Sequence, residues 1–311
     1  MAITATVSAI QEGMAIPEAQ LETWCNQGAI VTSASAYTSI KTAIWNSKSK
    51  IATRNPDVYL QGSYGNSTNI FADSDVDVVV QLSEPWGRDI SGLPDYQQQL
   101  YLESVVDATY AWRQFHADTV STLQSYFGAA AVKPGNKAVL VTLPSGRTAD
   151  VIPSFLYRKY KFFQAQNVQS YVSGIKFEDN AGRTIVNFPK EHITNGEAKN
   201  SKERTAFRYK QTVRMFKNAR NTAIDRGLLK DGTAPSYFVE CLLYNVPDAL
   251  FVADRQLTFI NVLDYANTKL PVDGALCQNG QLKLFGETPE QWKVQRAGEF
   301  LQSLINLWNH W

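Results

Sequence analysis

Three aspartates have the types and the spacing that metal-ion chemistry needs. Asp75 and Asp77 belong to the run Asp-Val-Asp-Val-Val-Val, which predicts a strand. Side chains alternate in a strand, so both carboxylates point the same way, with Cα atoms about 6.5–7 Å apart. Carboxylates that close repel one another unless a cation lies between them, and hard oxygen ligands favour Mg²⁺ or Mn²⁺. Asp150, in a later predicted strand of the same sheet, would complete a site for two ions.

A glycine-rich segment precedes these aspartates, with the sequence GSYGNST over residues 62–68. Gly62 allows backbone N–H groups to come close to an anion, and Ser63 adds a hydroxyl donor, as a triphosphate needs. Taken alone, a Gly-Ser pair is commonly a turn and an Asp-x-Asp run is commonly a solvated strand edge. Their combination with an apolar strand and a third aspartate predicts a phosphate cradle beside a metal site.

The elements that must position these residues follow from hydrophobic periodicity. Apolar spacing predicts a long or broken helix over 17–47 and one helix over 95–127 that packs on the sheet. Strand patterns separated by turn residues cover 58–61, 75–82, 138–143 with 148–155, and 169–188, the last two as hairpins. The fold class is α+β. We expect a catalytic part over 1–200 and a helical nucleotide-binding part over 201–311.

The helix expected over 207–220 carries two stripes about 100° apart. The apolar stripe consists of Tyr209, Val213 and Phe216. The basic stripe consists of Lys210, Arg214 and Lys217. Such a helix should bury the apolar stripe and present the basic one. A further amphipathic helix is predicted near the C-terminus, with apolar residues from Ala297 to Trp308.

Composition excludes several classes of protein. The 311 residues contain 30 Lys and Arg against 29 Asp and Glu, a net charge of +1, which argues against a protein that follows a nucleic-acid backbone by charge. Three cysteines and three scattered histidines offer no disulfide framework and no zinc cluster. A cytoplasmic setting fits best, because the N-terminus lacks the pattern of a signal peptide and no apolar run could span a membrane.

The spacing G-S-x(11)-D-x-D with a later single Asp resembles the nucleotidyltransferases of the polymerase β superfamily. More closely, the chain resembles the cGAS/DncV-like nucleotidyltransferases, bacterial enzymes that make cyclic oligonucleotide second messengers. The likeness also includes ADVIP, FPKEHITNGEAKN, VRMFKNARN and APSYFVECLLYNVP, over most of residues 58–250. It implies a catalytic lobe with a mixed sheet and an N-terminal spine helix, and a helical lobe closing over a nucleotide cleft.

The same resemblance implies roles for individual residues. Gly62 and Ser63 would hold the donor triphosphate, and the three aspartates would bind two Mg²⁺ or Mn²⁺ ions. On the helical part, Lys217 and Ser236 would reach the phosphates, and Tyr237 would stack on a base. Without the resemblance, the basic stripe is a solvated helix face and Tyr237 a core residue. The zinc insertion of the animal DNA sensor is absent, so no DNA activator is expected.

The function that the resemblance implies is synthesis of a cyclic di- or trinucleotide from NTPs, expected to be purines such as ATP and GTP, with release of pyrophosphate. The product would act on a separate downstream effector in anti-phage (CBASS) defence. One alternative is a nucleotidyltransferase that makes a linear oligonucleotide or modifies a protein or small molecule. Another is a catalytically silent NTP-binding regulatory module, which the presence of all three carboxylates argues against. An RNA-binding or RNA-tailing protein is disfavoured by the net charge.

Overall fold

The computed structural model describes residues 15–28, 31–71, 75–288 and 290–311, which form two compact units. The sheet unit comprises residues 31–62 and 75–190, and the helical unit comprises residues 15–28, 63–71 and 191–311. The expected division after residue 200 therefore differs from the structure. The chain leaves the sheet unit after Lys190, and the helical unit also includes the first helix and the 63–71 segment. The expected absence of a signal peptide concerns residues that lie outside the described ranges.

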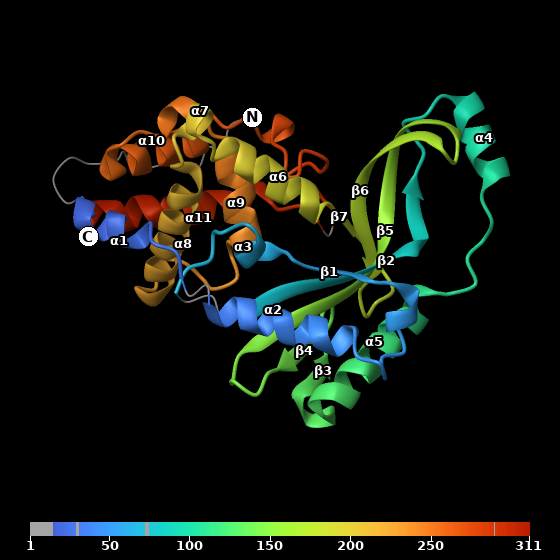
Figure 1. Cartoon of the computed structure of the whole chain (residues 1–311). Coiled ribbons are helices and arrows are strands. Elements are labelled where there is room, and N and C mark those ends of the chain that lie inside the picture. The colour runs from blue at the N-terminus through green and yellow to red at the C-terminus, as the bar shows by residue number, and fades with distance from the viewer. Residues whose placement is uncertain (1–14, 29–30, 72–74, 289) are drawn as a thin grey trace. The chain divides into compact units, whose positions relative to one another are not determined.

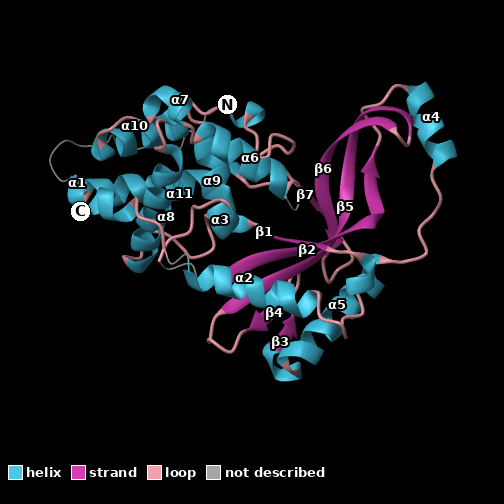
Figure 2. Cartoon of the chain, viewed as in Figure 1, coloured by secondary structure: helices cyan, strands magenta, loops and turns pink. Residues whose placement is uncertain are grey.

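The sheet unit is built on one seven-stranded mixed sheet (Figures 1 and 2). Its strands are β1 (Asp57–Leu60), β2 (Asp75–Asp89), β3 (Val132–Pro134), β4 (Val139–Thr142), β5 (Thr148–Ala165), β6 (Val168–Glu178) and β7 (Thr184–Asn187). The order is β1-β2-β5-β4-β3, and β6 pairs with β5 and β7. Only the pairing of β2 with β5 is parallel among these strands. Both predicted hairpins, β4–β5 and β6–β7, are confirmed as antiparallel pairs.

Helices of the sheet unit pack on this sheet (Figure 1). They are α2 (Val31–Ile44), α4 (Asp95–Ser104) and α5 (Trp112–Phe127), with short 3₁₀ turns at Ala52–Arg54 and Ala129–Ala131. The prediction of one helix over 95–127 is wrong, because residues 105–111 are not helical and Val105 is already extended. Val106 is 96% exposed, so it belongs to no buried helix face. The β-branched pair Val105-Val106 followed by Asp107 has low helix propensity, which accounts for the break.

The helical unit contains further helices, drawn in cyan like all helices in Figure 2. They are α1 (Glu18–Trp24), α6 (Pro189–Lys199), α7 (Lys202–Thr205), α8 (Tyr209–Asp225), α9 (Ser236–Tyr244), α10 (Arg255–Thr268) and α11 (Val294–Asn309), with 3₁₀ turns at Asp248–Leu250 and Val272–Gly274. The predicted C-terminal helix is confirmed as α11, whose apolar face is buried from Ala297 to Trp308. Leu21 and Trp24 of α1 lie in the same core as α8 and α11, which explains why α1 belongs to this unit.

The short helix α3 (Gly62–Gly65) is where the chain passes from the sheet unit to the helical unit. Within the described ranges, no helix combines the length and the apolar character needed to cross a membrane.

Candidate active site

Three aspartates of the sheet unit share one face of two parallel strands. Asp77 of β2 is the register partner of Asp150 of β5, and Asp75 is the partner of Thr148. Register partners in neighbouring strands point to the same face, and residues two apart in one strand do so as well. The hydroxyl of Thr148 donates a hydrogen bond to the Asp75 carboxylate. The alternation read from the sequence therefore places Asp75, Asp77 and Asp150 on one face, as predicted.

The surroundings of Asp150 disfavour its negative charge. Burial raises the pKa of the Asp150 carboxyl, and the charge of Asp75 raises it further. Each effect favours the neutral acid over the carboxylate. The fold therefore holds a carboxyl group ready to accept a proton next to a second carboxylate.

The donor set suits a divalent ion in its chemistry. Carboxylate oxygens are the ligands that Mg²⁺ and Mn²⁺ prefer, and a bound cation would offset the repulsion felt by Asp150. Across the described residues, however, no three His, Cys, Asp or Glu side chains already stand together as ligands of one ion.

The charge on Asp150 should make stability depend on pH in a defined direction. Its pKa is higher in the folded protein than in the unfolded chain. The free energy of unfolding is therefore greatest at a pH below the ordinary aspartate pKa, and it falls as the pH rises through the raised pKa. We expect Asp150→Asn to melt at or above the wild-type temperature at neutral pH with a chelator present. The difference in melting temperature between the two proteins should shrink as the pH falls below the ordinary aspartate pKa. Thermal melts of both proteins across pH check this, and an Asn variant that is less stable at neutral pH would contradict it.

Gly62 fits against Asp77 in a way that no other residue can. Its φ of +63° lies in the left-handed region, and a Cβ atom there would come 2.0 Å from Oδ2 of Asp77. The backbone N–H of Gln61 also donates to the Asp77 carbonyl oxygen at 3.0 Å. The turn after β1 is therefore built directly against one of the three aspartates.

The segment from Ser63 to Thr68 forms a compact turn that belongs to the helical unit. The Thr68 N–H donates to the Ser63 carbonyl oxygen at 2.9 Å, and the Ser67 N–H donates to that of Tyr64 at 3.3 Å. Ser67 has a φ of +56°, which closes the turn. Ser63, the predicted phosphate donor, is half-buried.

The basic stripe of α8 is not presented to solvent, so that prediction is wrong. Lys217 is fully buried and donates from Nζ to the Thr68 carbonyl oxygen at 2.9 Å. Arg214 donates to the carbonyl oxygens of Ser67 and Cys25, each at 2.6 Å. Lys210 is buried in an ion pair with Glu197. Lys210 and Lys217 are thus buried and Arg214 is half-buried, and the three cations have partners in the 63–68 turn, after α1 and on α6.

Ser236 and Tyr237 begin α9 after Pro235. Nη1 of Arg220 donates to the Ser236 hydroxyl at 3.4 Å and to the Ala234 carbonyl oxygen at 2.9 Å. The structure thus brings an unpredicted arginine to the serine that was expected to reach phosphates.

The Tyr237 ring lies among other aromatic side chains. It stacks on His192 with ring centroids 4.8 Å apart and on Trp292 at 5.6 Å. Its hydroxyl accepts a hydrogen bond from Asn279 at 3.0 Å. Stacking of Tyr237 on a base remains a prediction.

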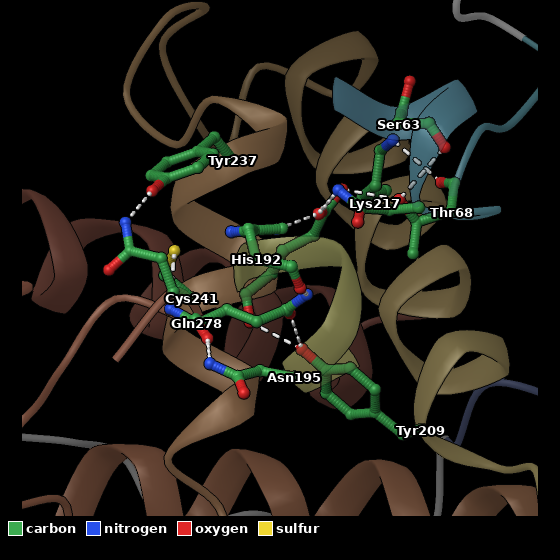
Figure 3. A network of polar contacts seen from close by, with 12 residues as sticks. Ser63, Thr68, His192, Asn195, Tyr209, Lys217, Tyr237, Cys241 and Gln278 are labelled. Carbon is green, nitrogen blue, oxygen red and sulfur yellow. Dashed lines mark hydrogen bonds and ion pairs between the residues drawn. The ribbon is translucent and has the colours of Figure 1, made fainter. Parts of the chain in front are cut away.

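Sequence reasoning missed Glu240, His192 and Thr68, which lie together inside the helical unit. Figure 3 shows His192 and Thr68 in this network of polar contacts. A signal was present for Glu240, because it is the only charged residue in the nine-residue helix SYFVECLLY. A lone carboxylate in an apolar helix is buried only with partners.

Comparison with known proteins identifies the family. The model of the cGAS/DncV-like nucleotidyltransferase C-terminal helical domain matches residues 194–309. The chain is 42% identical to a cyclic UMP-AMP synthase of Rhodothermus marinus, with 96% of this chain and 99% of that protein covered. It is 38% identical to the cyclic nucleotide synthase CdnE01 of Staphylococcus haemolyticus, with 96% and 100% covered.

A solved structure shows the same fold. The Rhodothermus marinus CdnE c-UMP-AMP synthase with Apcpp and Upnpp superposes with a TM-score of 0.85 at 41% identity, covering 95% of this chain and 97% of that one. The polymerase β-like α+β fold expected from the motifs is thereby confirmed. The family generally uses divalent metal ions. The chain belongs to the cGAS/DncV-like nucleotidyltransferases and is an enzyme of the cyclic nucleotide synthase class.

Proposed function

We propose that this enzyme joins one ATP and one UTP into a cyclic dinucleotide and releases two pyrophosphates. The choice of bases is supported by the cyclic UMP-AMP synthase of Rhodothermus marinus, which is similar over nearly the full length of both chains. The observation in this chain that carries the chemistry is the shared face of Asp75, Asp77 and Asp150, with Gly62 fitted against Asp77. The expected purine pair stays a second prediction, because a cyclic dipurine nucleotide synthase of Elizabethkingia meningoseptica is 34% identical over 63% of this chain.

The residues of this chain divide the work of each bond-forming step. A ribose hydroxyl of one nucleotide attacks the α-phosphorus of the other, the new P–O bond forms, and the bond to pyrophosphate breaks. Asp150, beside Asp77 on the neighbouring strand, takes the hydroxyl proton. Ser63 and the backbone beside Gly62 hold the triphosphate. A second step with the roles of the nucleotides exchanged closes the ring.

Two Mg²⁺ or Mn²⁺ ions held by Asp75, Asp77 and Asp150 are part of this proposal. When bound, they would neutralise charge on the triphosphate and on the leaving pyrophosphate. The carboxylate oxygens and their mutual repulsion support this assignment. A separate effector protein that responds to the product, the absence of a DNA activator and a cytoplasmic location remain predictions from the sequence.

Base selection can be tested directly with the purified chain. Each of the four NTPs is labelled in turn at the α-phosphate and incubated with the other three and Mg²⁺ or Mn²⁺, followed by phosphatase. We expect label from ATP and UTP to remain in one resistant product. Retention of ATP and GTP label would support the purine pair, and retention of none would contradict cyclic nucleotide synthesis.

A further inference from the structure

A carboxylate lies buried inside the helical unit, behind the turn of residues 63–68. Glu240 of α9 is 2% exposed. Its Oε1 accepts from the Thr68 hydroxyl at 2.5 Å, and its Oε2 accepts from Nδ2 of Asn66 at 3.1 Å. Nε2 of His192, on α6, lies 2.9 Å from Oε2. Two of these three partners, Asn66 and Thr68, belong to the turn itself, so the buried carboxylate is hydrogen-bonded directly to the turn.

The network keeps Glu240 charged despite its burial. Burial alone would raise the pKa of Glu240, but the hydrogen bond and charge of His192, the charge of Lys217 and the Thr68 hydroxyl together lower it. Lys217 comes from α8 and His192 from α6, so charged or titratable groups from two neighbouring helices face the carboxylate. A buried carboxylate with this many partners is costly to disturb, because each lost partner leaves a charge without compensation.

Thr68 is held from three directions, as Figure 3 shows for Thr68, Ser63 and Lys217. Its hydroxyl donates to Glu240, its N–H donates to the Ser63 carbonyl oxygen at 2.9 Å, and its own carbonyl oxygen accepts from Lys217 at 2.9 Å. Arg214 binds the adjacent carbonyl oxygen of Ser67 at 2.6 Å. The carbonyls at the end of the turn are therefore bound to cations of α8. A carbonyl oxygen that points at a phosphate would repel it. Because these carbonyl oxygens are bound to cations, they do not point toward the phosphate.

We propose that Glu240 is a positioning residue that, through Thr68 and Asn66, fixes the 63–68 turn in the conformation that binds the donor triphosphate. Lys217 is then the counter-ion of this network and acts on the nucleotide through the Thr68 carbonyl. The proposal rests on the proposed function in one respect, which is that Ser63 binds the triphosphate. It assigns a role to a buried cluster that the chemistry of the three aspartates leaves unexplained.

The test uses Thr68→Val, which keeps the size of the side chain and removes its hydroxyl, and Glu240→Gln, which removes the charge. Each should weaken binding of a non-hydrolysable NTP analogue about ten-fold, measured by calorimetry at fixed salt, since a hydrogen bond to a charged group is lost. Affinity for the corresponding nucleoside should be unchanged. Because both act through one contact, the double variant should lose little more than the worse single variant. Thr68→Ser should restore wild-type affinity.

Asp248→Asn is the matched control, because Asp248 also pairs with a buried lysine of the helical unit, Lys199, at 2.8 Å. It should lower the melting temperature without changing NTP affinity. The proposal is overturned if Thr68→Val behaves like this control, with a lower melting temperature and unchanged binding. Should Glu240→Gln not fold, the Thr68→Val and Thr68→Ser pair decides alone. A wild-type chain that binds NTP as expected but makes no cyclic product would refute the proposed function and leave the positioning role standing.

Discussion

Asp77→Asn is expected to abolish product formation while leaving the protein folded. The substitution keeps the shape of the side chain but deletes one of three carboxylates that share a sheet face. Loss of a metal ligand should lower the rate at least about 100-fold, because mutation of a residue that only hydrogen-bonds to a metal ligand already lowers metal affinity or activity about 10- to 100-fold. Asp75→Asn should behave in the same way and should also lower the pKa of Asp150, since the charge of Asp75 helps to raise it. Initial rates of pyrophosphate release, together with thermal melts, measure both effects.

A control for these variants lies on the same strand. Asp89 is the last residue of β2, and its carboxylate accepts hydrogen bonds from the backbone and hydroxyl of Ser91. Asp89→Asn should leave the rate at the wild-type level. The assignment of the three aspartates fails if Asp77→Asn retains wild-type turnover.

Gly62→Ala is expected to be the most damaging small substitution in the phosphate turn. A methyl group there would lie 2.0 Å from Oδ2 of Asp77, and the φ of +63° is one that alanine rarely adopts. The left-handed conformation alone costs about 1–2 kcal/mol, and the clash must displace either the turn or the aspartate. We expect both nucleotide affinity and turnover to collapse, with a clear fall in melting temperature.

Gly146→Ala separates backbone strain from the clash. Gly146 also has a positive φ, +81°, but its added Cβ would meet nothing within 4 Å. This variant should lose a similar amount of stability from strain and keep its nucleotide affinity. Equal losses of activity in the two variants would show that Gly62 matters only as a turn residue.

The sheet and its aspartates could be predicted from the sequence because their signals are local. The two-residue period of Asp75 and Asp77 fixes their common face, and the turn before Thr148 predicts the hairpin of β4 with β5 that contains Asp150. These features depend on residues close in the chain, whereas the pairing of Asp150 with Asp77 joins strands far apart in the chain. The family motifs add the chemical roles.

The surroundings of α8 could not be predicted, because they depend on residues far apart in the chain. A stripe of three cations on one helix usually faces water, and here Lys217 meets a carbonyl from residue 68 and Arg214 one from residue 25. Helical periodicity shows which residues share a face but not what covers that face. The partners of Glu240 were hidden for the same reason, since they come from α6, α8 and the turn.

Ring closure by the wild-type protein tests the central claim most directly. ATP and UTP labelled at the α-phosphate, each in a separate reaction, are incubated with the enzyme and Mg²⁺ or Mn²⁺, then with phosphatase, and the product is weighed by mass spectrometry. We predict that the resistant product retains the label of both nucleotides and weighs one water less than the linear dinucleotide that still carries its 5'-monophosphate. A product that keeps the label of the bridging phosphate alone, with the mass of the linear dinucleotide without a terminal phosphate, would contradict cyclic nucleotide synthesis.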